Sequence, residues 1–213
     1  MILNDKTLFK DLFIKEDVNS FMTTKKSNLA AIVKPLLEQK NKIVRARQTH
    51  SENVAIIDDI TEKNILSISD CDALITNLKN TYLSIKVADC MPILIYHKSG
   101  WIAAIHAGRE GTIKKILYKT LKSLLTLTNK EKDYHVWFGP CICVNCHQIN
   151  KKTNTCYNLL KENTIQLKEL LPDSGNSLYI NKMCTRCNSN HLFHSYRGDN
   201  YTKKRNYIFI GLK

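Results

Sequence analysis

The chain has 213 residues, of which 43% are hydrophobic, enough for one domain with a sizeable core. No apolar run approaches the length of about 18 residues that a membrane span needs, and no basic start leads into an apolar stretch, so we expect a cytoplasmic protein. The net charge of +13 could indicate a nucleic-acid partner. However, lysines are spread over the whole chain and the basic clusters are short, so we disfavour nucleic acid and membrane partners.

The pattern of apolar residues predicts alternating helices and strands. A first helix is expected over residues 25–39, where Pro35 could cause a kink or an early stop. Strands are then expected at 43–47, 54–57, 82–88, 93–96 and 101–105, followed by an amphipathic helix over 112–127. A strand at 134–138, a helix over 156–171 and strands at 177–180 and 207–210 complete the chain. This order predicts a single domain over residues 1–213, of α/β or α+β class, with a mixed sheet.

Three polar segments follow predicted strands, and together they contain the residue types that zinc prefers. His50 follows the first strand, Cys90 lies between two strands, and His106 ends the strand before the long helix. One thiolate and two imidazoles would leave a fourth metal position open, which is the pattern of catalytic zinc sites. Asp89, next to Cys90, could orient a ligand histidine or act as a base. Surface or core positions for these histidines are the alternative.

The segment from His106 to Gly111 also has the features of an anion site. A strand, two glycines (Gly108 and Gly111) and a helix start would direct free backbone N–H groups and the helix dipole at a phosphate. Arg109 adds a guanidinium group whose geometry suits phosphate. An ordinary strand-to-helix turn is the alternative.

Eight cysteines in a chain without a secretion signal predict reduced thiols, metal ligands or catalytic groups. Two CxxC pairs, Cys143 with Cys146 and Cys184 with Cys187, could form a second zinc site and make the chain a zinc-stabilised binding module. Buried free thiols are the alternative. The segment His50-Ser51-Glu52 matches half of the zinc deaminase signature, but its P-C-x-x-C half is missing.

Seven short motifs in this order resemble the laccase-domain proteins, also called polyphenol oxidase or peptidoglycan-editing-factor proteins. The likeness extends from about residue 28 to the C-terminus. The motifs are Gln48-Thr49-His50, Asp72-Ala73-Leu74-Ile75-Thr76, Asp89-Cys90-Met91-Pro92-Ile93-Leu94, His106-Ala107-Gly108-Arg109-Glu110-Gly111, Gly139-Pro140-Cys141-Ile142, Cys184-Thr185 and Phe193-His194-Ser195-Tyr196-Arg197.

The resemblance implies a compact α/β sandwich, grouped with cysteine-hydrolase-like toxins, in which His50, Cys90 and His106 are the metal ligands. It implies a zinc enzyme that cleaves purine nucleosides with phosphate and deaminates adenosine, or alternatively a copper-dependent polyphenol oxidase. We favour zinc, because we find no ligands for several copper centres. Asp89 and Cys90 are then the candidate catalytic residues. The candidate substrate- or phosphate-binding residues are Gln48, Gly108, Arg109 and Arg197.

The chain departs from the family pattern near its N-terminus, where residues 1–27 form a shortened segment. Residues 21–26 lack the family's glycines, and Leu29 stands where members carry an arginine expected to face substrate or phosphate. Arg45 or Arg47 could compensate. Altered substrate preference, or a protein that kept the fold and lost catalysis, is therefore a further hypothesis. The physiological substrate and the choice between monomer and homodimer are left open by the sequence.

Overall fold

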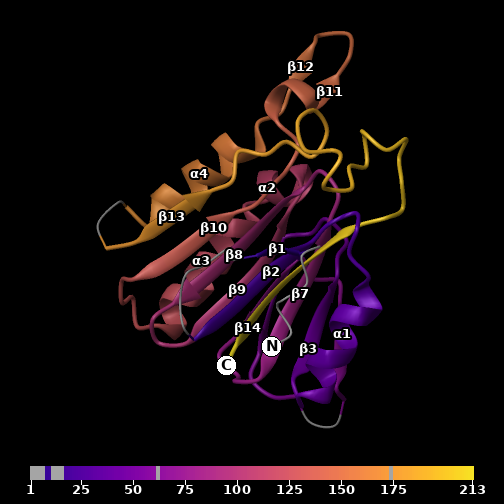
Figure 1. Cartoon of the computed structure of the whole chain (residues 1–213). Coiled ribbons are helices and arrows are strands. Elements are labelled where there is room, and N and C mark those ends of the chain that lie inside the picture. Colours follow the sequence, from indigo (N-terminus) through magenta and orange to yellow (C-terminus); the bar gives the residue numbers. More distant parts are fainter. Residues whose placement is uncertain (1–7, 11–16, 61–62, 173–174) are drawn as a thin grey trace.

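The computed structural model describes residues 8–10, 17–60, 63–172 and 175–213, which contain two six-stranded mixed sheets (Figure 1). In the first sheet the strand order is β1 (Leu8–Lys10), β2 (Val18–Thr23), β14 (Asn206–Leu212), β7 (Thr81–Val87), β3 (Lys42–Arg47) and β5 (Ile65–Ser69). In the second sheet it is β13 (Ser177–Ile180), β10 (Tyr134–Phe138), β8 (Met91–His97), β9 (Trp101–Ala107), β6 (Ala73–Thr76) and β4 (Val54–Ile57).

The main hydrophobic core lies between the two sheets. Alternate residues of β7, such as Leu83, Ile85 and Val87, pack against alternate residues of the second sheet, such as Leu94 and Ile102. This two-residue period follows from the pleat of a strand, which directs successive side chains to opposite faces. Every residue of β8 is buried, because its other face is covered as well.

Helices cover both outer faces, which gives four layers. Helix α1 (Leu29–Glu38) packs on the outer face of the first sheet through residues such as Ile32 and Leu36. Helices α2 (Arg109–Ile113), α3 (Ile116–Leu127) and α4 (Leu159–Leu170) lie on the second sheet (Figure 1). The expected α+β sandwich is confirmed, with two mixed sheets at its centre. No described helix has the length and apolar character of a membrane span.

The long helix predicted over 112–127 is two helices, and this prediction was wrong. Lys115 has a φ of 64°, in the left-handed region, and ends the regular hydrogen-bonding pattern. Ile113, which fits the apolar period, is 57% exposed. Gln166 of α4 bridges the break, since its side-chain N–H donates to the Thr112 carbonyl at 2.8 Å and its oxygen accepts from the Tyr118 N–H at 3.2 Å. Tertiary contacts thus satisfy backbone groups that a continuous helix would have paired.

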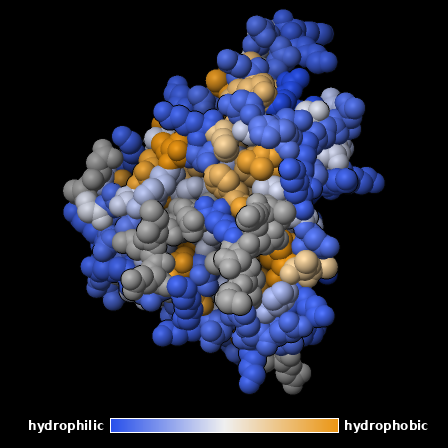
Figure 2. Space-filling model, in the orientation of Figure 1, coloured by the Kyte–Doolittle hydropathy of each residue, from blue (hydrophilic) through white to orange (hydrophobic). Residues whose placement is uncertain are grey.

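The other predicted helices begin later than expected. Asn28 caps α1 by accepting hydrogen bonds from two backbone N–H groups, and α1 continues for one turn beyond Pro35. Asn158 caps α4 by accepting a hydrogen bond from one backbone N–H, whereas Cys156 belongs to a small hairpin of β11 (Gln148–Asn150) and β12 (Thr155–Cys156). This hairpin projects from the body (Figure 1), and Figure 2 shows that its surface is largely hydrophilic.

The N-terminal segment contributes strands that the sequence did not predict. β2 pairs with β1 and β14, and Phe21 stacks on Phe209 with ring centroids 4.9 Å apart. Residues 21–23, where the family's glycines are missing, therefore belong to a regular strand. Strands β5 and β6 were also missed, because each is a short edge or near-edge strand with weak alternation.

Candidate functional site

The candidate site lies at one end of the sandwich, where strands of both sheets start or stop. β3 and β7 are parallel and end at Arg47 and Val87, while β9 ends at Ala107 beside the starts of β6 and β8. Loops from both sheets therefore meet at this end. They bring His50, Cys90 and His106 together from positions up to 56 residues apart in the sequence.

The three side chains form a group that could hold a metal ion. Their ligand atoms all lie within 4.8 Å of one another, and His50 Nε2 is 3.8 Å from Cys90 Sγ. A tetrahedral zinc ion with Zn–S of about 2.3 Å and Zn–N of about 2.0 Å separates such ligand atoms by about 3.3–3.5 Å. The donor set and the spacing therefore fit zinc, with a fourth coordination position left for a ligand.

Asp72, which was noted in the sequence only as part of a motif, organises this group. Its fully buried carboxylate accepts a hydrogen bond from His106 Nδ1 at 2.6 Å, so His106 Nε2 remains for a metal. The same carboxylate accepts bonds from the backbone N–H groups of Thr49, His50 and Ser51. Asp72 therefore orients one candidate ligand and fixes the loop that carries another, as carboxylates behind metal-bound histidines do.

Electrostatics favour an ionised thiol in this group. Burial acts to raise the pKa of Cys90, but the charges and hydrogen bonds of His106 and His50 outweigh it and lower the pKa to about 6. Burial likewise acts to lower the pKa of His106, but the Cys90 thiolate and Asp72 raise it to about 9. The pair is thus a thiolate next to an imidazolium, and a metal ion would displace the imidazolium proton.

The backbone comes very close to the candidate ligands at one glycine, and it is strained at two residues of the same site. A Cβ added to Gly108 would lie 3.0 Å from both Cys90 Sγ and His50 Cδ2, so only glycine leaves the group undisturbed. His50 and Asp89 have φ values of 61° and 83°, which are rare for residues with a side chain. Such strain persists where the surrounding hydrogen bonds hold it, and it concentrates at functional sites.

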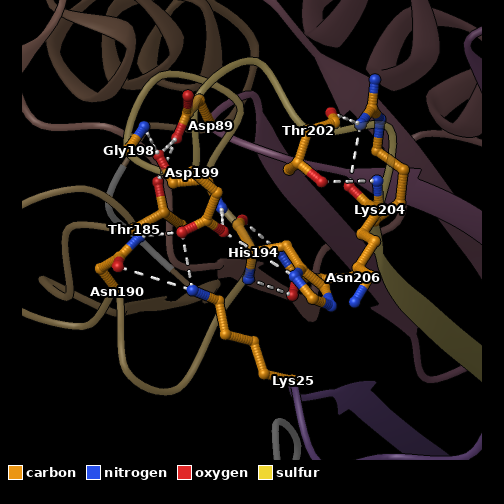
Figure 3. A network of polar contacts seen from close by, with 12 residues as sticks. Lys25, Asp89, Thr185, Asn190, His194, Gly198, Asp199, Thr202, Lys204 and Asn206 are labelled. Atoms are coloured by element: carbon orange, nitrogen blue, oxygen red, sulfur yellow. Dashed lines mark hydrogen bonds and ion pairs between the residues drawn. The ribbon is translucent and has the colours of Figure 1, made fainter.

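Asp89 does not orient a ligand histidine, because that contact belongs to Asp72. The Asp89 carboxylate accepts hydrogen bonds from the hydroxyls of Thr185 and Ser195 at 2.7 and 2.6 Å and from the Arg197 N–H at 2.7 Å. Figure 3 shows this contact within a larger polar network around residues 185–206. Asp89 therefore ties the start of the Cys90 segment to a distant loop.

That network also fixes the loop to the N-terminal part of the chain. Lys25 forms an ion pair with Asp199 at 2.8 Å, and the Asn190 amide donates to the same carboxylate oxygen at 2.9 Å (Figure 3). Asn206, at the start of β14, exchanges two hydrogen bonds with the His194 backbone at 2.8 Å each. Asp199 and His194 of the loop are thus fixed to Lys25 and to the start of β14.

A pocket of about 710 Å³ opens over the three candidate ligands, within the usual range of small-molecule sites. Of the four candidate substrate- or phosphate-binding residues, Gln48, Arg109 and Arg197 line it and Gly108 does not, and the three lining residues all have protein partners. The Gln48 amide forms two hydrogen bonds with the Lys86 backbone. Arg109 pairs with its neighbour Glu110 at 2.7 Å, and Arg197 donates to the Gln148 carbonyl at 2.6 Å.

One side of the pocket, which we call the basic wall, consists of Lys86, Lys203 and Arg205 and was not predicted from the sequence. Lys86, Lys203 and Arg205 line the pocket, because β14 pairs with β7 and brings residues 203–205 beside Lys86. Tyr196 also lines it, is 43% exposed and lies under the Arg205 guanidinium. The only sequence signal for this wall was the short basic cluster at 203–205.

His147 is a further lining residue that sequence reasoning did not select. Its Nδ1 donates to the Tyr157 carbonyl at 3.1 Å, which leaves Nε2 as a free acceptor. Burial and the nearby Arg197 lower the pKa of His147. The neutral imidazole is therefore favoured, and its Nε2 can accept a hydrogen bond or a proton from a ligand.

Several other residues that the sequence suggested as functional lie outside the pocket lining. Leu29 packs against the hydrophobic cluster between α1 and the first sheet. Neither Arg45 nor Arg47 lines the pocket, so these arginines do not supply there the charge expected at position 29. Glu52, the acidic residue of the partial deaminase signature, pairs with Lys114 and Lys119. The H-x-E interpretation therefore has no support in the geometry.

The sequence has relatives with known names. A family model described as multi-copper polyphenol oxidoreductase laccase matches residues 16–213. A purine nucleoside phosphorylase of Campylobacter jejuni is 33% identical over 174 residues, which cover 76% of this chain and 74% of the relative. A purine nucleoside phosphorylase of Aquifex aeolicus is 34% identical over 183 residues, with coverages of 78% and 86%. The adenosine deaminase RL5, from an unknown prokaryotic organism, is 32% identical over 114 residues, with coverages of 50% and 43%.

Solved structures share the fold at lower sequence identity. YlmD from Geobacillus stearothermophilus superimposes with a TM-score of 0.79 at 21% identity and covers 93% of both chains. The Neisseria meningitidis protein NMB0706 has a TM-score of 0.75 at 18% identity, with coverages of 98% and 100%. The four-layer sandwich is therefore a fold that these solved bacterial proteins share.

Proposed function

Since the chain belongs to the multi-copper polyphenol oxidoreductase laccase family, we propose that it is a zinc-dependent enzyme that cleaves purine nucleosides with phosphate. The observation that carries this proposal is the convergence of His50, Cys90 and His106 at a pocket with a basic wall. The names of the Campylobacter and Aquifex relatives support the reaction class.

The donor set favours zinc over several copper ions. One thiolate and two imidazoles, with a fourth position open, suit a single zinc ion that acts as a Lewis acid when bound. Among the described residues, only two groups of side chains could hold a metal, and together they contain two histidines. A multi-copper centre needs more imidazole ligands than these groups offer.

The pocket supplies charge for phosphate on one side. Phosphorolysis forms a bond between a phosphate oxygen and C1′ of the ribose, while the bond from C1′ to the base nitrogen breaks and its electron pair leaves with the base. Lys86, Lys203 and Arg205 would bind and orient the phosphate through charge-assisted hydrogen bonds. We therefore assign phosphate to this wall. The start of α2 is less suitable, because α2 has only five residues and Arg109 there is paired with Glu110.

Aromatic and imidazole groups complete the proposed substrate contacts. The exposed ring of Tyr196 would stack against the purine base, an interaction that contributes about 1–3 kcal/mol. The free Nε2 of His147 would hold or move a proton between the pocket and the substrate. Asp89 would act as a positioning residue, since its carboxylate already holds Ser195 and the Arg197 backbone.

The test is a set of steady-state assays on protein purified without a metal-chelating tag. Inosine and adenosine are offered with and without phosphate, and released base, sugar phosphate and ammonia are measured. We expect phosphate-dependent base release that falls at least 100-fold in Cys90→Ala, as loss of a metal ligand predicts. Cys156→Ala is the matched control, because Cys156 lies in the β11–β12 hairpin outside the pocket lining, and its activity should equal that of wild type.

Three outcomes would contradict the proposal. Base release that does not need phosphate would indicate a hydrolase, and ammonia without base release would indicate a deaminase like the one named RL5. Oxidation of phenols with bound copper would favour the alternative activity. Arg205→Gln provides a further check, since it should raise the KM for phosphate more than the KM for inosine.

A further inference from the structure

The two CxxC pairs come together at the base of the β11–β12 hairpin. All four sulfur atoms of Cys143, Cys146, Cys184 and Cys187 lie within 4.8 Å of one another. The Cys143 and Cys187 sulfurs are 3.9 Å apart. A tetrahedral zinc ion bound by four thiolates, with Zn–S of about 2.3 Å, separates the sulfurs by about 3.8 Å. The cluster therefore has the size of a four-thiolate metal site.

We propose that these four cysteines bind one zinc ion in a structural site that is separate from the His50, Cys90 and His106 group. The four protein ligands would fill the coordination sphere, so no position would remain for substrate, as in structural zinc sites. The two ligand pairs come from segments separated by 37 residues, and each pair has the x2 spacing of a zinc-binding turn.

Backbone geometry around the sulfurs supports bound thiolates. Each CxxC pair lies in a tight turn, one of them the 3-10 helix η2 (Val144–Cys146), with the Cys146 N–H donating to the Cys143 carbonyl at 3.1 Å. The Cys143 N–H donates to Cys184 Sγ at 3.2 Å. N–H donors stabilise the charged form of a sulfur that they contact.

The proposed ion would join the segment of Cys184 and Cys187 to the segment that contributes Ile142 and His147 to the pocket lining. The strand-like contact between Cys141 and Cys184, with the Thr185 N–H donating to the Cys141 carbonyl at 3.1 Å, already aligns them. On one side of the cluster, Thr185 donates to Asp89, and on the other, Gln148 accepts from Arg197. Zinc at this point would therefore hold this part of the pocket lining and the hairpin base in place.

The test counts zinc per chain by mass spectrometry in protein purified under reducing conditions without a chelating tag. We expect two zinc ions in wild type, one in Cys90→Ala, one in Cys143→Ser/Cys187→Ser and none in the triple variant. The double variant changes a half-buried and an exposed cysteine, so the core of the second sheet keeps its buried residues. Cys156→Ser, which alters a thiol outside both groups, should retain two ions.

A second measurement on Cys90→Ala does not depend on how the double variant folds. Its remaining ion is exchanged for Co²⁺, and the absorption of four thiolates around tetrahedral cobalt is expected. One zinc in wild type that disappears in Cys90→Ala would overturn the proposal. Stoichiometric iron in place of zinc would also overturn it. A third contrary result would be that only four of the eight thiols react when the protein is denatured in chelator without reductant, since that count indicates two disulfides. None of these results depends on the proposed catalytic activity.

Discussion

Replacing Asp72 with asparagine tests the central feature of the candidate site. The Asp72 carboxylate accepts five hydrogen bonds, one from His106, three from backbone N–H groups and one from the Ser51 hydroxyl. An asparagine at this position would not be equivalent, because its amide nitrogen has two N–H groups and would face donors. Burial acts to raise the pKa of Asp72, but His106 and Ser51 hold it well below its usual range, so the carboxylate is charged at neutral pH.

The expected effect of Asp72→Asn is large for both folding and metal binding. Breaking one side of a buried, hydrogen-bonded ion pair costs about 3–5 kcal/mol in the free energy of unfolding. Loss of the carboxylate behind a metal-bound histidine weakens metal affinity by about 10- to 100-fold. Because domains of this kind are stable by about 5–15 kcal/mol, the variant should remain folded at 25 °C.

Two assays separate these effects. The free energy of unfolding is measured by urea denaturation in the presence of chelator, and zinc affinity is measured by competition with a chromophoric chelator. Asp70→Asn is the matched control. Asp70 lies in the same segment and contacts Thr49 and Asn53, but it is exposed, so its substitution should change the free energy of unfolding by less than about 1 kcal/mol.

The reasoning would be refuted if Asp72→Asn and Asp70→Asn had equal unfolding free energies and equal zinc affinities. That result would mean that the His106–Asp72 contact neither stabilises the fold nor orients a ligand. A loss of stability with unchanged zinc affinity would retain the structural role of Asp72 and reject its role behind the metal site.

Three further predictions concern the metal site, the loop network and the helix break. Gly108→Ala should weaken zinc binding about tenfold in the competition assay, because the added methyl group would lie against two candidate ligands. In the folded protein, burial acts to raise the pKa of Asp199, but Lys25 lowers it to about 2, so the stability that this carboxylate contributes is present above pH 4. The difference in unfolding free energy between wild type and Asp199→Asn should therefore narrow as pH falls from 5 to 2. Gln166→Ala should lower the free energy of unfolding by about 1–3 kcal/mol in urea, while Lys161→Ala, an exposed change in the same helix, should not.

Each of these predictions can fail in a specific way. Unchanged zinc affinity in Gly108→Ala would mean that the loop shifts to make room for the methyl group. A stability difference for Asp199→Asn that does not depend on pH would show that the side chain acts by packing alone. Equal stability of Gln166→Ala and Lys161→Ala would mean that water satisfies the backbone groups at the helix break.

The sequence alone determined much of the framework. Strands such as β4, β10 and β13 have the predicted limits. In β10 the reason is plain, because a short run of apolar residues indicates a strand that is buried on both faces. Membership in the laccase family followed from seven ordered motifs and is confirmed by the family match. The types of the candidate ligands were also visible, since thiol and imidazole side chains lie directly after predicted strands.

Tertiary structure decided which polar groups meet. Asp72 and His106 are 34 residues apart, and Asp89 and Ser195 are 106 apart, so no local pattern links them. The break between α2 and α3 has the same origin, because Gln166 on another helix satisfies it. The spacing of apolar residues along one helix or strand shows only which face of that element is buried. The partners of buried carboxylates, amides and thiols are chosen by how distant segments pack, since each buried polar group must find a partner in the folded chain.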